Sequence, residues 1–307
     1  MTTALVHLGA GIGDIVLATP MIAALEQLHI RIDLCLSADY PQTASLFEGW
    51  PAIRRVFPDD ELVAALARRP DLVIAAIPPF YWRTFQPLFH HLRRPPDSLF
   101  YSDQQGWYLA FAATAGWSAD AKPDTWLPIG PNTTEVGAAT VVIAPGSKTG
   151  EMAHKRWPHF ATLATRLRDL DIVVVGTADD LAAGADRLIF PPGVRSFAGQ
   201  LTLRETAAIL AGAGVVVAND NGLAHVAAAV GTPTITLFGP TSERVFGTLA
   251  PHQETLRAPF PCAPCWQAVR YGACQGRIDC LRSLDVDVVE RRVRAWITPQ
   301  TSIEEKS

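Results

Sequence analysis

The amino-acid sequence predicts an α/β protein with two domains, each built on a parallel, doubly wound sheet. Short apolar runs of strand length alternate with segments of helical spacing along most of the 307 residues, as expected for successive βαβ units. At about 150 residues per domain, the length suits two domains. The stretch 121–138 contains three prolines, two glycines and few apolar residues, which favours a linker there.

The first domain is predicted over residues 1–130. Its expected strands cover 4–8, 32–36 and 71–77. A helical pattern over 15–28 follows the first strand, and a second helix is expected to begin near 44–47. Pro20 interrupts the first pattern: it either kinks the helix or takes the first position of a new helix that Thr19 caps. The residues alone leave both alternatives open.

The second domain is predicted over 131–285, followed by a C-terminal helix and tail over 286–307. Its expected strands cover 140–144, 172–175, 215–218 and 234–238, and its helices 159–170, 203–211 and 223–230. An amphipathic helix is predicted over 285–297, and 301–307 is expected to fray. Because ligands bind at the carboxyl ends of the strands in such sheets, the functional residues should follow strands directly.

The composition excludes several classes of protein. A net charge of −4 and a pI of about 6.1 argue against a nucleic-acid partner. A hydrophobic content of 49% excludes wholesale disorder, and no apolar run approaches the roughly 18 residues of a spanning helix. No basic residue precedes the N-terminal apolar stretch, and five cysteines do not make a disulfide framework. We therefore expect a cytoplasmic, soluble protein with at most peripheral membrane contact.

A glycine-rich segment follows the first predicted strand. Gly9, Gly11 and Gly13 allow a tight turn and a close backbone approach to a ligand. Asp14 stands where the dinucleotide fingerprint G-x-G-x-x-G needs its third glycine, so the segment does not predict NAD binding. A carboxylate at this edge of the sheet can accept a proton from a substrate hydroxyl. The alternative is an acidic residue that only complements the helix macrodipole.

Two further loops carry polar residues. Residues 145–150 (PGSKTG) are similar to a phosphate loop without satisfying G-x-x-x-x-G-K-[ST], and Lys155 beyond them can pair with a phosphate. Residues 219–225 (NDNGLAH) join a buried strand to an alanine-rich helix, whose free N–H groups favour an anion. Asp220 is placed to hold sugar hydroxyls. His225 falls in the first helical turn, where a lone histidine is more often structural.

Four cysteines lie close together near the C-terminus. Cys262, Cys265, Cys274 and Cys280 are spaced C-x₂-C-x₈-C-x₅-C. Four thiolates suit a tetrahedral zinc or iron site, whose role would be structural because no ligand position stays open. The alternative is a set of reduced, partly buried thiols.

Several motifs together resemble the heptosyltransferases, glycosyltransferase family 9. They are GDIVLATP at 13–20, KRWP at 155–158, NDNGLAH at 219–225, LFGPT at 237–241 and PCAPCW at 261–266. The resemblance runs from about residue 4 to residue 297 in order and spacing. It implies a GT-B architecture, with two Rossmann-like domains facing across a cleft, the acceptor on the first and the sugar nucleotide on the second. It also implies inverting transfer of heptose from ADP-L-glycero-D-manno-heptose without an essential metal.

The resemblance assigns roles to individual residues. It makes Asp14 the general base and places Lys155 near the donor phosphates. The donor site it implies comprises Gly11, Gly13, Ser147, Lys155, Asp180, Asp220, Asn221, Gly222, His225 and Thr241. The family places an acid on the adenosine ribose near Asp179 or Asp180, which is a loose match. The loop 147–153 looks longer than the family pattern. Some members that modify proteins carry an iron-bound cysteine finger, which Cys262, Cys265, Cys274 and Cys280 resemble.

The acceptor and some alternatives stay open. The implied acceptor is a saccharide, glycolipid or protein, such as the lipopolysaccharide inner core, a protein or a small glycoside. One alternative function is a GT-B transferase that uses another sugar nucleotide, and another is a non-catalytic GT-B binding protein. The aromatic segment 79–83 is either a wall of the acceptor site or part of the core. The sequence fixes neither the donor sugar nor the oligomeric state.

Overall fold

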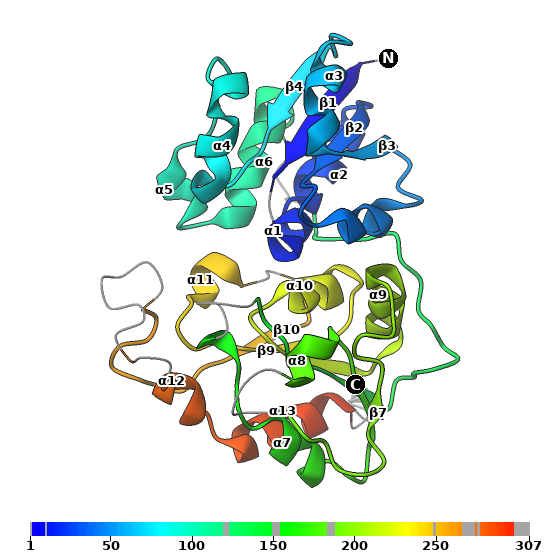
Figure 1. Cartoon of the computed structure of the whole chain (residues 1–307), viewed down its shortest axis with the longest axis vertical. Helices are drawn as coiled ribbons and strands as arrows, with labels where there is room; N and C mark the ends of the chain where they lie inside the picture. Colours follow the sequence, from blue (N-terminus) through cyan, green and yellow to red (C-terminus); the bar gives the residue numbers. More distant parts are fainter. Residues whose placement is uncertain are drawn as a thin grey trace, which may run out of the picture. The chain divides into compact units, whose positions relative to one another are not determined.

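The computed structural model describes residues 2–9, 11–118, 123–148, 154–182, 188–247, 250–265, 274 and 277–297. The chain divides into two units (Figure 1). Unit 1 comprises Met1–Ile129 and Arg244–Ala250, and unit 2 comprises Gly130–Glu243 and Pro251–Ser307. The predicted frayed tail and most of the loop 147–153 lie outside the described residues.

Unit 1 is built on a four-stranded parallel sheet in the order β3-β2-β1-β4. The strands are β1 (Thr3–Leu8), β2 (Arg31–Leu36), β3 (Ile53–Pro58) and β4 (Leu72–Ala75). The helices are α1 (Ile12–Leu17), α2 (Thr19–Gln27), η1 (Pro41–Phe47), η2 (Asp59–Glu61), α3 (Leu62–Leu66), α4 (Pro79–Phe89), α5 (Asp97–Phe100) and α6 (Gln104–Thr114). The three predicted strands are confirmed. The helix predicted to begin near 44–47 is instead the 3₁₀-helix η1, which begins at Pro41 and ends at Phe47.

The helical pattern over 15–28 forms two helices, because α1 and α2 are separate on either side of Ala18. Pro20 lies in the first turn of α2, where its missing N–H costs no helical hydrogen bond. Thr19 does not cap α2 with its side chain; its hydroxyl donates to the Val16 carbonyl at 2.8 Å. The new start is therefore the correct alternative, with a different residue at the cap.

Unit 2 is built on a six-stranded parallel sheet in the order β10-β9-β8-β5-β6-β7. The strands are β5 (Thr140–Ala144), β6 (Asp171–Val174), β7 (Arg195–Ser196), β8 (Val215–Asn219), β9 (Thr234–Leu237) and β10 (Gln253–Leu256). Its helices include α7 (Phe160–Arg166), α8 (Ala178–Ala182), α9 (Leu203–Gly212), α10 (Gly222–Ala229), α12 (Asp279–Arg282) and α13 (Val286–Ile297), and α11 (Glu243–Phe246) lies at the unit boundary. All four predicted strands are confirmed.

The core of unit 2 explains why these elements form. Val141 and Val217 on the central strands pack with Trp157 and Phe160 from α7 and the segment before it. Val289 belongs to the same cluster, which joins the apolar stripe of α13 to unit 2. None of the helices in the described ranges combines the length and the apolar character that crossing a bilayer requires.

Candidate active site

Three loops of unit 2 meet at one edge of its sheet. β5, β8 and β9 are consecutive neighbours and all parallel, so the segments that follow them emerge at the same edge. These segments hold five of the predicted donor residues: Ser147, Asp220, Asn221, Gly222 and Thr241. The topology therefore gathers side chains that are nearly one hundred residues apart in the sequence.

Two asparagine amides hold the loop after β5 against the end of β8. Asn219 donates from Nδ2 to the Pro145 carbonyl at 2.5 Å, and Asn221 donates to the Gly146 carbonyl at 2.7 Å. Their oxygens accept in turn: Asn219 from the Trp157 backbone at 2.9 Å, and Asn221 from the third residue of α10 at 3.0 Å. Asn221 is thus the N-cap of α10 as well as a support for the loop.

Lys155 and Asp220 form an ion pair beside the start of α10. The Nζ–Oδ2 distance is 3.1 Å, and the two side chains are 14% and 5% exposed. Removing one member of such a pair leaves a buried charge uncompensated. An ammonium group next to the free N–H groups of a helix start makes this edge attractive to an anion.

Asp180, the residue that matches the family pattern only loosely, already accepts hydrogen bonds from its neighbours in the protein. Its carboxylate accepts from the Thr177 backbone at 2.8 Å and from Arg156 at 3.3 Å. Arg156 also donates to the hydroxyl and the carbonyl of Ser147, at 3.1 and 3.0 Å. Asp180 packs so closely on Gly146 that a Cβ there would lie 2.2 Å from its Cγ. A contact between Asp180 and a ribose stays a prediction.

Two buried polar groups at this edge lack a partner among the described residues: Nδ1 of His225 and the hydroxyl of Thr241. Burial lowers the pKa of His225 to about 4, against the opposing charge of Asp220 and with a smaller contribution from Lys155. The imidazole is therefore neutral at physiological pH. Buried groups of this kind normally find a partner, so both are available to hold a ligand oxygen or hydroxyl.

Arg257 supports the loop after β9, and no motif in the sequence singles it out. Its guanidinium donates to the Gly239 carbonyl at 2.5 Å and also to the Thr241 carbonyl. It further donates to Glu243 at 2.6 Å. Arg156 and Asn219 were likewise missed as supports, although both stand inside the quoted motifs.

Asp14 lies in unit 1, in the first turn of α1. Its Oδ1 accepts from Nε2 of Gln104 at 2.6 Å. Gly11 is the N-cap of α1, and a Cβ on it would lie 3.9 Å from the ring of Tyr40. Gly11 and Gly13 also belong to unit 1, whereas the other predicted donor residues belong to unit 2. Their part in donor binding stays a prediction.

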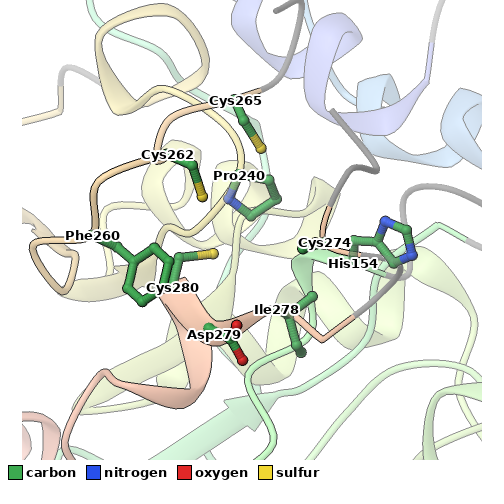
Figure 2. A pocket seen from close by; sticks show the side chains of 9 residues that line it. All are labelled: His154, Pro240, Phe260, Cys262, Cys265, Cys274, Ile278, Asp279 and Cys280. Carbon is green, nitrogen blue, oxygen red and sulfur yellow. The ribbon is translucent and has the colours of Figure 1, made fainter. Parts of the chain in front are cut away.

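Four cysteines line one small pocket of unit 2 together with His154 and Asp279 (Figure 2). Cys262, Cys265 and Cys280 are drawn on one side of it, and Cys274 beside His154. Burial, with smaller contributions from the other thiols, raises the pKa of Cys280 to about 11. The four sulfurs are the donors that a soft metal prefers. Among the described residues, however, no three ligand groups are arranged to hold a metal, and most of 266–276 lies outside them.

Comparison with known proteins gives a family match. The family model for glycosyltransferase family 9 (heptosyltransferase) matches residues 93–272. Lipooligosaccharide heptosyltransferase 2 of Haemophilus influenzae is 37% identical over 122 residues, which amount to 37% of this chain. The matched part spans only 35% of the length of that curated relative.

Two solved structures share the fold over nearly the whole chain. Escherichia coli ADP-heptose lipopolysaccharide heptosyltransferase II superposes with a TM-score of 0.73 at 20% identity, covering 97% of this chain and 98% of that one. The iron-containing dodecameric glycosyltransferase TibC of enterotoxigenic E. coli gives 0.68 at 16% identity, covering 95% and 75%. At these low sequence identities, the likeness concerns the fold alone. It confirms the predicted α/β architecture of the GT-B type.

Proposed function

Because the chain belongs to glycosyltransferase family 9, the heptosyltransferases, we propose that it moves a heptose from an ADP-linked donor to an acceptor hydroxyl with inversion. The observation that carries this proposal is the Lys155–Asp220 pair at the start of α10, beside a loop held by Asn219 and Asn221. A diphosphate is the ligand that suits one ammonium group and a helix N-terminus.

The donor half of the reaction needs charge stabilisation. The diphosphate gains negative charge as it leaves the anomeric carbon, and Lys155 and the start of α10 are positioned to stabilise that charge. Lys155 would exchange part of its contact with Asp220 for the phosphate. The neutral His225 and the hydroxyl of Thr241 supply hydrogen bonds to uncharged donor oxygens, because Nδ1 of His225 and the Thr241 hydroxyl have no other partner among the described residues.

The acceptor half needs a base. As the acceptor oxygen attacks the anomeric carbon, its proton passes to the Asp14 carboxylate, and the C–O bond to the diphosphate breaks on the opposite face. A positioned base of this kind typically accelerates the reaction by about 10²–10⁴-fold. The transition state resembles an oxocarbenium ion, as in glycoside hydrolysis.

We assign a saccharide acceptor of the lipopolysaccharide inner core, because two of the three proteins compared above, the H. influenzae enzyme and heptosyltransferase II, are named for lipooligosaccharide or lipopolysaccharide. A protein or a small glycoside is the alternative acceptor. We place the reaction in the cytoplasm, as the composition predicts. A GT-B transferase with another sugar nucleotide remains the alternative function.

We also propose that the four cysteines hold one structural iron or zinc. The donor set supports it, and TibC, which shares the fold, is named as iron-containing. Such a metal would stabilise the segment 262–280 and take no part in the transfer. Metal analysis of protein purified without chelators should give about one equivalent per chain, and less than about 0.2 equivalents would contradict the site.

The variant Asp14→Asn tests the proposed function. Asn keeps an oxygen that can accept from Gln104, so the local geometry should survive while the base is lost. We expect transfer to fall by at least about 10²-fold while ADP still binds. Asp39→Asn, at an exposed acidic residue of the same unit, serves as the control. Turnover of Asp14→Asn at the wild-type rate would remove Asp14 from the base role.

A further inference from the structure

We propose that Gln104 is a positioning residue, which sets the orientation of the Asp14 carboxylate. The proposal rests on the proposed function, because it matters to the reaction only if Asp14 is the base. The carrying observation is the 2.6 Å hydrogen bond from Nε2 of Gln104 to Oδ1 of Asp14, which joins residues 90 positions apart.

The structure holds Gln104 firmly. It is the first residue of α6 and only 2% exposed. Asp103 caps the helix by accepting from the Gly106 backbone at 2.8 Å. At Gly106 a Cβ would lie 2.2 Å from the Asp103 carboxylate, so a side chain there would displace the capping group. The start of α6 therefore presents the amide of Gln104 in one defined place.

Tyr108 lies one turn further along α6 and closes the arrangement. Its side chain is buried, and burial raises its pKa well above the usual value, with a further contribution from the Asp14 charge. A hydrogen bond with the Gln104 side chain acts in the opposite direction. The phenol therefore stays protonated.

The hydrogen bond from Gln104 to Asp14 suits the positioning of a base better than a purely structural contact between helices. An N–H donor on one carboxylate oxygen restricts the rotation of the group and favours its charged form. An amide does this without the full positive charge of Lys or Arg, which would weaken the base. The other end of the amide, Oε1, has no partner among the described residues. The donor end is thus the functional end of Gln104.

The experiment compares three variants of the full chain: Gln104→Ala, Gln104→Glu and Gln105→Ala. Gln105 is the matched control, because it is the next residue of α6, is buried, and donates to Thr125 at 3.0 Å instead of to Asp14. The readouts are the titration of the ¹³C-labelled Asp14 carboxyl, assigned with Asp14→Asn, and ADP release from ADP-heptose. ADP release is followed with a heptose-deficient lipooligosaccharide fragment and with water alone as acceptor.

We expect Gln104→Ala to raise the Asp14 pKa and to lower kcat by roughly 10–100-fold, with the KM for ADP-heptose unchanged. Gln104→Glu should move the acidic limb of the pH–rate profile upward by about one pH unit or more, because two carboxylates then share a proton. Gln105→Ala should move neither the limb nor the Asp14 titration.

The proposal is overturned if both Gln104 variants match Gln105→Ala in the carboxyl titration and in kcat. Failure of the proposed function looks different: Asp14→Asn would then release ADP at the wild-type rate. If Gln104→Glu does not fold, Gln104→Ala decides the matter alone through the titration of Asp14, which requires no acceptor.

Discussion

Replacing Gly146 by alanine should disrupt the loop after β5 through one neighbour, Asp180. An ideal Cβ on Gly146 would lie 2.2 Å from Cγ and 2.3 and 2.4 Å from the two oxygens of Asp180. The carboxyl group must therefore move by about 1 Å to reach an ordinary van der Waals distance. It cannot do so freely, because it accepts from Thr177 and from Arg156.

The cost follows from these contacts. Overpacking of a tight site typically costs about 1–3 kcal/mol, and a weakened hydrogen bond to a charged group adds about 1.5–3 kcal/mol. We expect Gly146→Ala to lower the free energy of unfolding of unit 2 by roughly 3 kcal/mol. Hydrogen exchange of the amides in β5 and β8 measures this quantity for unit 2 by itself.

A double-mutant cycle separates this clash from other causes. In the Asp180→Ala background the obstacle is absent, so Gly146→Ala should cost less than about 1 kcal/mol. Gly137→Ala is the control, because a Cβ at Gly137 meets nothing within 4 Å, and it should change stability by no more than about 0.5 kcal/mol. An equal cost of Gly146→Ala in both backgrounds would refute the reasoning.

Three further predictions concern unit 2. Lys155→Met should weaken ADP binding by roughly 10–100-fold and destabilise unit 2, because it leaves Asp220 unpaired. Calorimetry measures the affinity for ADP, and thermal melts measure the stability. Lys155→Arg keeps the charge, so it should lower the affinity and the stability by less. Because folding lowers the pKa of His225, the unfolded chain takes up this proton at a higher pH than the folded chain does. The free energy of unfolding therefore has its full value above pH 6.5 and falls by about 3 kcal/mol as the pH drops from 6.5 toward 4. His225→Gln should flatten that part of the stability–pH curve, and an unchanged slope would assign the titration elsewhere. Thr202→Ala should lower the free energy of unfolding, measured by urea titration, by about 1 kcal/mol, because Thr202 and Glu205 form the capping box of α9. Thr165→Ala removes an exposed hydroxyl that donates to the Ala161 carbonyl, and it should lower that free energy by less.

The central strands and the edge strand β4 were predictable, whereas the other three edge strands, β3, β7 and β10, were not. Val141 and Val217 belong to apolar runs buried on both faces, which mark inner parallel strands directly. β3 escaped prediction because an edge strand is half exposed: its Arg54 and Arg55 pair with Asp33 on β2 instead of continuing an apolar pattern. β7 and β10 are likewise short and incompletely buried edge strands.

Some residues of the candidate site could likewise be predicted from the sequence, and others could not. Lys155 and Asp220 could be predicted because each stands in a short motif after a strand, and the structure brings them into contact. The support by Arg257 and the bond between Gln104 and Asp14 could not be predicted. Each depends on segments that meet only when the sheet has formed, and neither carries a local pattern.

The central claim is that the edge of the unit 2 sheet binds the ADP part of a sugar nucleotide. Calorimetric titration of the purified protein with ADP, UDP, GDP and CMP, run side by side, tests it most directly. We predict selective binding of ADP, weakened in Lys155→Met and unchanged in Asp14→Asn. Preference for another nucleotide would contradict the ADP-heptose donor, and binding of none of the four would contradict the nucleotide site itself.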